Sequence, residues 1–335
     1  MRMTHLWQRF IKQRTASWAL SLCGGLLFLA FAGPLICNQR PLLMSYHGHI
    51  YMPIFQDVTW QDLGQDQPRP IDYQDHNVIQ EINAHGWLWR APVEFDAYVI
   101  DWDSHVPLPS GSTRRHPLGQ LEDGRDTLAV LLAGLRVSVI FGCLLTLASS
   151  LIGLVIGMVQ GYYGGVIDLL GQRIIDVWSS IPSLYVLIIL ASLTSRHIGW
   201  LFVILLLFSW MNLVGLVRAE TLRNRQLDYV KAAVMMGVGH WRIMWRHILP
   251  NSTIAAVSMF PFNLAGSMIA LSSLNFLGFG LAPYEPTLGG LLAQAYRHLD
   301  ATTLVMSAVI TTGGLLTLFV LLGTSLRQAL DPHDG

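Results

Sequence analysis

Long segments without charge dominate this sequence and restrict its fold more than any other feature. Charged residues make up 13% of the 335-residue chain, about half of their usual share. A helix needs about 20 apolar residues to cross a hydrocarbon core of about 30 Å. We therefore expect an all-α polytopic membrane protein with six transmembrane helices. Six stretches of at least 19 residues contain no Asp, Glu, Lys or Arg: 15–39, 137–167, 177–195, 197–217, 247–284 and 301–326.

Basic residues set the expected orientation of these helices. Four of them, and no acidic residue, precede the first apolar run: Arg2, Arg9, Lys12 and Arg14. The loop at 219–251 also has an excess of basic residues. Because cytoplasmic segments are enriched in Lys and Arg, we expect both termini and this loop in the cytoplasm. The expected spans are about 18–36, 137–159, 178–195, 198–217, 253–276 and 303–323.

The first apolar run has a second interpretation, as a cleaved signal peptide. Ala30-Phe31-Ala32 fits a small-x-small cleavage site. The run continues to Cys37, which is long for a signal peptide, so an uncleaved membrane anchor is favoured. Cys23, Cys37 and Cys143 lie in or beside apolar runs and are expected to be packing residues.

The segment 38–126 differs from the rest of the chain. It holds 13 acidic residues against six arginines and no lysine. An acidic segment that follows a positive-inside helix belongs outside the cytoplasm, so we expect a periplasmic insert with a β-rich or loop-rich fold. The expected organisation is therefore an N-terminus and first span at 1–37, the insert at 38–126 and a five-helix core at 127–335. An enzyme or receptor tethered by the first helix and built on the insert remains an alternative.

The sequence lacks a phosphate-binding loop of the kind with which many proteins bind ATP. It has no G-x-x-x-x-G-K-[ST] loop, and neither of its two lysines, Lys12 and Lys231, follows a glycine. No acid or base lies deep in a span, which disfavours an ion-coupled carrier. ATP is therefore expected on a partner subunit, with a passive channel or secondary carrier as the alternative. The 21 basic and 21 acidic residues cancel, so no nucleic-acid partner is expected.

Two short polar patterns are weak candidates for chemistry. Asp101 and Asp103 have the residue type of a paired-carboxylate site, but two acids in an acidic segment are more often a solvated surface. His47 and His49 have no third ligand at a spacing that closes a metal site. We expect no catalytic residue, no cofactor and no metal in this chain.

Small and polar residues within the spans have more specific interpretations. Gly153, Gly157 and Gly161 recur at every fourth position, which permits close helix packing. Pro261 is expected to kink the fifth span, and Asn263 needs a polar partner at that depth. Either feature, together with Asn275, is a candidate for the substrate path.

The cytoplasmic loop carries the most informative pattern. Helix-forming residues from Asp228 lead to Gly237, which is suited to a left-handed helix stop. Gly239 is an acceptable N-cap for a second helix that is expected to end near Pro250. Two short helices within 224–250 would project from the membrane and present the small residues Ala232 and Ala233. The alternative is an ordinary basic tether between two spans.

Together these motifs resemble those of a known family. Ala232-Ala233 followed by Gly237 and then Leu249-Pro250 resembles the EAA signature of ABC importer permeases, although Lys231 occupies the position of the family Glu. Further motifs resemble the second, C-type permease of dipeptide/oligopeptide importers, and Gly86-Trp-Leu-Trp89 is closest to the oligopeptide/microcin C branch. These motifs are His116-Pro-Leu-Gly119, Gly124-Arg-Asp126, Gly161-Tyr-Tyr-Gly-Gly165, Ser180-Ile-Pro182, Arg246-His-Ile-Leu-Pro-Asn251, Phe276-Leu-Gly-Phe-Gly280 and Asp331-Pro332.

The resemblance implies a type I ABC importer permease fold in the cell inner membrane. The implied partners are a second, unlike permease, two ABC ATPase subunits and a periplasmic solute-binding protein. The implied cargo is peptides or peptide-like compounds, and ATP would be hydrolysed by the ATPase subunits. The implied ATPase-coupling residues are Tyr229, Ala232, Ala233, Gly237 and His240.

Overall fold

The computed structural model describes residue 10 and residues 13–64, 69–102, 107–193 and 196–330. Arg2, Arg9, Lys12, Asp103 and the Asp331-Pro332 motif lie outside these residues. The chain divides into two compact units, each considered by itself: unit 1 is 1–24, 138–282 and 313–335, and unit 2 is 25–137 and 283–312.

Five described helical segments are long and apolar enough to cross a membrane. They are α2 (Arg14–Phe31), α5 (Thr127–Tyr163), α8 with α9 (Ile198–Ser209 and Met211–Arg225), the segment His240–Phe276, and α14 (Thr302–Leu330). A sixth candidate is the pair α6 (Gly165–Ser179) and α7 (Ser183–Leu193), which meet at 72°. The fold is therefore mostly helical, with five or six apolar spans.

The bent pair differs from the single third span expected at 178–195. Helix begins at Gly165, and it breaks between Ser179 and Ser183. Pro182 explains the break, because proline has no N–H to donate and disfavours helix in the residue before it.

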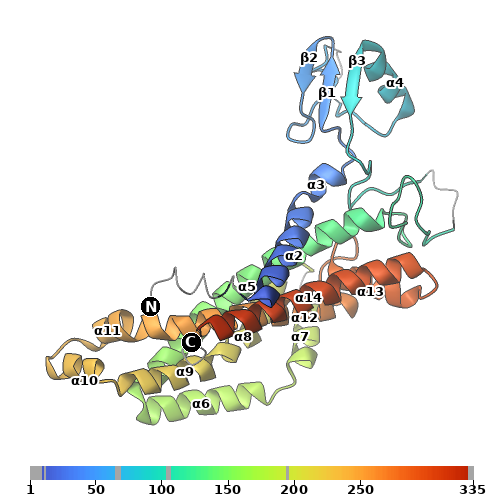
Figure 1. Ribbon diagram of the computed structural model, residues 1–335. Coiled ribbons are helices and arrows are strands. Elements are labelled where there is room, and N and C mark those ends of the chain that lie inside the picture. The colour runs from blue at the N-terminus through green and yellow to red at the C-terminus, as the bar shows by residue number, and fades with distance from the viewer. Residues whose placement is uncertain (1–9, 11–12, 65–68, 103–106, 194–195, 331–335) are drawn as a thin grey trace. The chain divides into compact units, whose positions relative to one another are not determined.

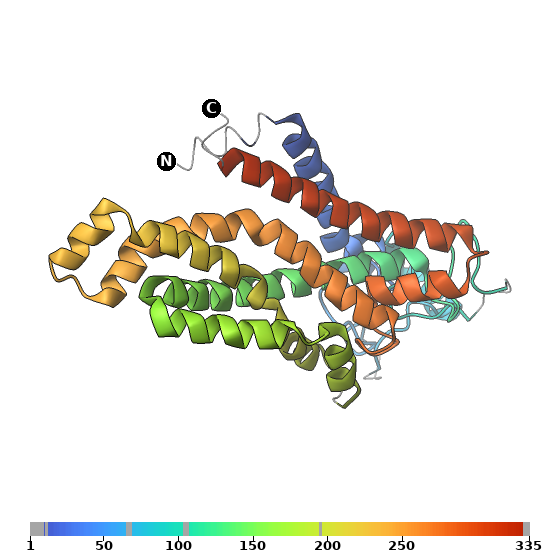
Figure 2. The same cartoon turned by 90° about the horizontal axis from the view of Figure 1, so that it is seen from below.

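Unit 1 contains most of the membrane-crossing helices. Its largest described core joins α5, α9 and the segment His240–Phe276 through buried side chains such as Met158, Val217 and Met244. Figure 2 shows α9 and α12 (Leu249–Phe276) side by side, with the short helices α10 (Asp228–Met235) and α11 (His240–Ile243) forming a hairpin beyond their ends.

Unit 2 contains a small sheet, which lies in the segment 38–126 for which a β-rich or loop-rich fold was predicted. The antiparallel order is β2 (His49–Tyr51), β1 (Leu43–Tyr46) and β3 (Gly86–Trp89), and α4 (His76–His85) precedes β3 (Figure 1). His47 and Gly48 both have positive φ, as the two-residue turn between β1 and β2 requires. Met44 and Ile82 are fully buried in the core of this module.

A second core of unit 2 joins segments that are distant in the sequence. α13 (Leu288–Arg297) contributes Leu291 and Ala295, and these pack with Ala129 and Leu132 at the start of α5. Thr287 caps α13, since its hydroxyl accepts the Gly290 N–H at 3.0 Å. The short helix α3 (Gly33–Ile36) follows α2, and Cys37 joins the same core.

Candidate functional site

The hairpin of α10 and α11 is the candidate site, and its turn has the predicted geometry. Gly237 has φ of +74°. Its N–H donates to the Val234 carbonyl at 3.0 Å, and the Val238 N–H donates to the Ala233 carbonyl at 3.1 Å. These two bonds form a Schellman motif, which ends α10 and reverses the chain.

The two alanines of the hairpin have different surroundings. Ala233 is 3% exposed and packs with Val230, Ile243 and Ile248 in the core of unit 1. The prediction that Ala233 is presented to a partner is therefore wrong, because this face of α10 closes on its own chain. Ala232 is exposed, as predicted.

An apolar surface that sequence reasoning did not single out covers the end of the hairpin. Met235 is 88% exposed, Met236 76% and Trp241 61%. We call these three residues the apolar tip. Apolar side chains that are exposed together on a protein surface are typical of an interaction site, and methionine is frequent at such sites. The signal in the sequence was present, since Met235 and Met236 immediately precede the glycine turn.

Tyr229 and His240, the flanking residues, have partners within unit 1. The Asn251 side chain donates to the Tyr229 hydroxyl at 3.0 Å. The Tyr162 hydroxyl and His240 Nδ1 are 2.8 Å apart, which ties the start of α11 to the end of α5. Both residues therefore anchor the hairpin, while Tyr229 remains 45% exposed.

The second helix of the hairpin does not end near Pro250. Helix runs from His240 to Phe276, through the π-helical turn η1 (Met244–Ile248) and into α12. The Leu249 N–H bonds to the Met244 carbonyl, five residues back. This wider turn absorbs a proline that has no N–H and would clash with the carbonyl four residues before it.

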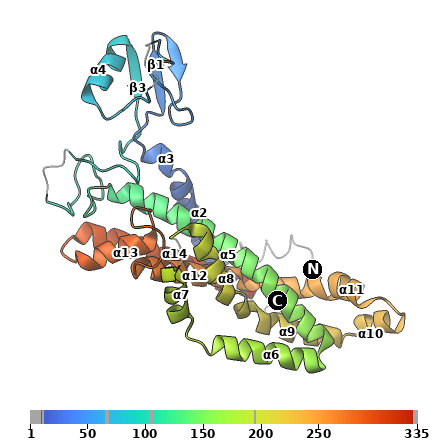
Figure 3. The same cartoon turned by 180° about the vertical axis from the view of Figure 1, so that it is seen from behind.

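The glycine stripe of α5 lies against α9. A Cβ on Gly153 would be 2.7 Å from the Trp210 carbonyl oxygen, and one on Gly161 would be 2.7 Å from the Arg218 carbonyl oxygen. Gly157 has the same relation to the Val214 carbonyl oxygen, at 2.8 Å. Figure 3 shows α6 along the same region, where the Arg218 guanidinium pairs with Asp168 on α6.

The residues predicted for the substrate path are not gathered together. α12 continues through Pro261 without a break, and Asn263 is partly buried. Asn275 is buried, and its side-chain oxygen accepts the Leu281 N–H at 2.8 Å, so it holds the turn after α12.

A cleft of about 310 Å³ lies elsewhere in unit 1, at the bend between α6 and α7. It has no charged lining residue, and both polar and apolar side chains line it. The polar lining residues are Ser179, Ser183, Ser209, Asn212 and Ser267.

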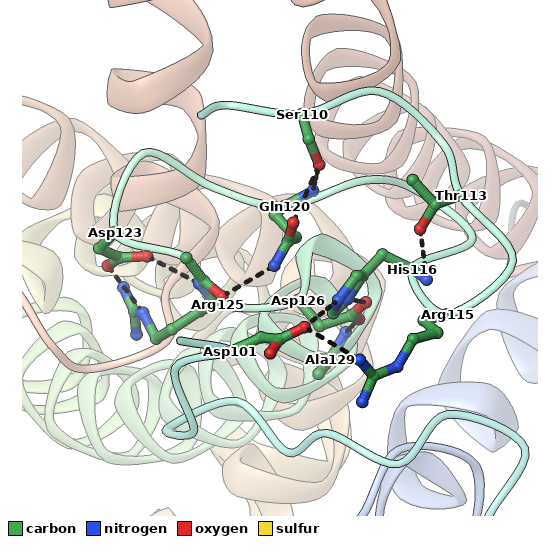
Figure 4. A network of polar contacts seen from close by, with 11 residues as sticks. Asp101, Ser110, Thr113, Arg115, His116, Gln120, Asp123, Arg125, Asp126 and Ala129 are labelled. Carbon is green, nitrogen blue, oxygen red and sulfur yellow. Dashed lines mark hydrogen bonds and ion pairs between the residues drawn. The ribbon is translucent and has the colours of Figure 1, made fainter. Parts of the chain in front are cut away.

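A buried polar network in unit 2 involves two of the sequence motifs (Figure 4). His116 Nδ1 is 2.9 Å from Asp126 Oδ2, and Nε2 is 3.2 Å from Asp101 Oδ2. All three side chains are at most 6% exposed. Asp101 therefore faces a histidine and holds a structural position, and its sequence neighbour Asp103 lies outside the described residues. Burial raises the pKa of Asp126, although bonds from the Ala129 N–H and His116 oppose this shift.

Metal binding has no support in the described ranges, where no three His, Cys, Asp or Glu side chains form a group that could hold an ion. The His47 ring instead contacts the rings of Tyr46 and His85.

Known proteins resemble this chain over nearly its whole length. The model of the family described as "Binding-protein-dependent transport system inner membrane component" matches residues 153–333. The chain is 42% identical over 329 residues to the inner membrane ABC transporter permease protein YejE of Escherichia coli K12, covering 98% of the chain and 96% of that protein. It is 38% identical to the peptidoglycan transport system permease protein YejE of Agrobacterium fabrum, covering 98% and 92%. It is 32% identical to the dipeptide transport system permease protein DppC of Haemophilus influenzae, covering 66% and 76%.

Proposed function

This chain belongs to the family of binding-protein-dependent transport system inner membrane components, and we propose that it is a permease subunit of an ATP-driven importer of peptides or peptide-like compounds. The relatives named above support the substrate class, since one is a dipeptide and another a peptidoglycan transport permease. A microcin C type of cargo belongs to the same proposal. The subunit itself catalyses no reaction, and ATP is bound and hydrolysed by a partner.

The apolar tip is the observation that carries the coupling mechanism. Met235, Met236 and Trp241 expose apolar side chains on a hairpin whose other face is buried in its own core. In the proposed assembly these three side chains enter a groove of an ATPase subunit, with Ala232 and the Gly237 turn at the rim. Closure of the ATPase dimer would then move the hairpin and rock the spans between inward-facing and outward-facing states.

The proposed assembly places this chain beside a second, unlike permease in the cell inner membrane. Six spans with both termini in the cytoplasm, an acidic insert at 38–126 outside and a solute-binding protein above complete the arrangement. Single cysteines would replace Asp62 and Arg225 in a background without Cys23, Cys37 and Cys143. A membrane-impermeant thiol reagent added to intact cells should then label position 62 only. Labelling at 225 alone would reverse the topology.

The uncharged cleft at the α6–α7 bend is the proposed path surface. Irregular backbone at membrane depth is tolerated where it lines a cavity. Serine hydroxyls and the Asn212 amide can exchange hydrogen bonds with peptide groups without selecting a side-chain charge. Pro261, Asn263 and Asn275 would then support the structure of α12. Of the three, Asn263 is the best candidate for direct contact with the substrate.

Reconstitution tests the division of labour. The purified chain alone should not hydrolyse ATP, whereas the complex with its second permease and ATPase should hydrolyse ATP faster when loaded binding protein is added. Uptake that survives loss of the ATPase would favour a passive channel or secondary carrier. Hydrolysis of a peptide or glycan by the chain alone would favour a tethered enzyme.

A further inference from the structure

A small pocket in unit 2 has no place in the transport cycle described above. It holds about 210 Å³ between the end of α2, the helix α3, the loop at 96–98 and the start of α5. Its floor is made of small or apolar residues that are themselves buried: Ala30, Gly33, Cys37, Ala97, Ala129 and Leu132.

The rim of this pocket carries one charge of each sign. Arg136 and Asp96 both line it, with Asn38 and Tyr98 beside them. Two backbone N–H groups, from Tyr98 at 2.7 Å and Val99 at 3.1 Å, hold Asp96 Oδ1 in place. Within the described part of the chain, neither Arg136 nor Asp96 has an ion-pair partner. The two charges therefore face the pocket without neutralising each other.

The sequence places the pocket at the edge of the bilayer. Arg136 is the last charged residue before the uncharged run 137–167, and Asn38 lies at the end of the uncharged run 15–39. Residues at such boundaries lie at the depth of lipid headgroups. The pocket thus combines buried small and apolar side chains with one charge of each sign at the boundary of two apolar spans.

We propose that this pocket binds one phospholipid with a zwitterionic headgroup, namely phosphatidylethanolamine. The Arg136 guanidinium would bind the phosphate, for which its donor geometry is suited, and Asp96 would accept hydrogen bonds from the ammonium group. The glycerol region would lie on the small residues of α3 and α5. A zwitterionic peptide carries the same two charges, but the boundary position and the apolar floor favour the lipid.

Native mass spectrometry of the assembled importer tests this site. The complex would be purified in mild detergent and mixed with equal amounts of phosphatidylethanolamine and phosphatidylglycerol. The unmodified complex should retain phosphatidylethanolamine preferentially. Arg136→Gln should reduce its retention at least about fivefold, whereas Arg114→Gln, an exposed arginine of the same unit, should leave retention unchanged.

Two further variants separate charge recognition from folding. Asp96→Asn keeps the oxygen that accepts the Tyr98 and Val99 N–H groups, so it should remove the preference for phosphatidylethanolamine over phosphatidylglycerol while lipid is still bound. Ala133→Leu, which fills the pocket without changing charge, should reduce retention of both lipids. Co-purification of the second permease reports that each variant is assembled.

Three results would overturn the proposal. The first is equal retention of the two lipids by the unmodified complex, which needs no variant to fold. The second is unchanged lipid retention in both Arg136→Gln and Ala133→Leu. The third is displacement of the bound species by trialanine at a concentration that supports uptake, which would assign the pocket to the cargo. The first two results are measured from lipid retention alone, so they do not depend on ATPase coupling or on uptake.

Discussion

Some residues of the hairpin pack in its own core and others are proposed to dock on a partner, and Ala233 belongs to the first group. Ala233→Asp would place a carboxylate in the core formed with Ile243 and Ile248. A buried unpaired charge costs about 3–5 kcal/mol, so the melting temperature of the purified subunit should fall by several degrees. Ala232→Asp is the matched control, because the Ala232 side chain is exposed. Equal melting temperatures of the two variants would contradict this assignment.

Met235 belongs to the apolar tip, which is proposed to dock on the ATPase. Met235→Asp puts a charge on a side chain that is 88% exposed in the isolated subunit, so folding should be unaffected. Desolvating that charge in an ATPase groove should weaken association at least tenfold, about 1.4 kcal/mol or more. Lys231→Glu, which restores the family residue at an exposed position, should change association little. Co-purification of the ATPase measures both, and equal recovery with Met235→Asp would mean that the tip does not dock.

The turn residue Gly237 gives a third test. Gly237→Val forces a β-branched residue to adopt a φ of +74°, which costs of order 1–3 kcal/mol. A displaced tip should reduce uptake and stimulated ATP hydrolysis, while pairing with the second permease persists. Gly237→Asn, which tolerates positive φ, should retain most activity. Identical activity of the two variants would exclude a role for the turn geometry.

Sequence reasoning identified Gly237 but misplaced Ala233 for a physical reason. A glycine after a helical run signals its turn locally. The face on which an eight-residue helix packs depends on the rest of the fold, and α10 is apolar at both buried Val230 and exposed Met235. The sequence therefore predicted the turn and not the buried face.

Among the helices, close packing of α5 on α9 makes Gly157 sensitive to any side chain. Gly157→Ala would put a Cβ 2.8 Å from the Val214 carbonyl oxygen and 2.9 Å from the Val217 Cβ. The overpacking should cost about 1–3 kcal/mol and lower the melting temperature. Gly215→Ala on α9 meets no atom within 4 Å, so its higher helix propensity should preserve or raise stability. A stable Gly157→Ala variant would show that the two helices can separate without cost.

Hydrophobic runs located the helices well, and charges within a helix concealed one. α6 was missed because Asp168, Arg173 and Asp176 interrupt its apolar pattern. The charge of Asp168 is compensated by an ion pair with Arg218 of α9. This partner is 50 residues away, so no local sequence pattern reveals it. Pro250 likewise predicts a helix end, but the π-helical turn before it lets the helix continue.

At the scale of the whole molecule, unit 2 is assembled from distant segments, and one ion-pair cluster makes this assembly dependent on pH. Glu122 accepts hydrogen bonds from Arg297 and His298. Partial burial acts to raise the pKa of Glu122, but the bonds from Arg297 and His298 outweigh it, so the pKa is lowered. A lowered pKa means that the stabilisation is present above the unfolded-state pKa and is lost as pH falls through the folded-state value.

Glu122→Gln should therefore be less stable than the unmodified protein at neutral pH, by about 0.2–1 kcal/mol for a partly exposed pair. The difference should vanish in acid, below the lowered pKa of Glu122. Thermal unfolding of the purified subunit at pH 7 and at successively lower pH measures it, with Glu220→Gln as a control outside this cluster. A stability difference that persists or grows in acid would contradict the sign of the shift.

The linear sequence conveys only part of this organisation. The acidic composition of 38–126 separates it from the spans, and its placement outside the cytoplasm stays a prediction. Composition does not show that 283–312 joins 25–137 in one compact unit. That association depends on Leu291 and Ala295 packing with the start of α5, and these residues have no distinguishing local pattern.

The uninterrupted helix from His240 to Phe276 has a mechanical consequence. Its 37 residues extend for about 55 Å, with the apolar tip next to one end. A rigid rod of that length turns an angular displacement of one degree into about 1 Å of travel at the opposite end. If the helix ended at Pro250, as the sequence predicts, a hinge at that point would reduce the displacement of the opposite end. The π-helical turn instead continues the helix, so in the proposed assembly a small rotation of the hairpin would be expected to displace the opposite end of this segment.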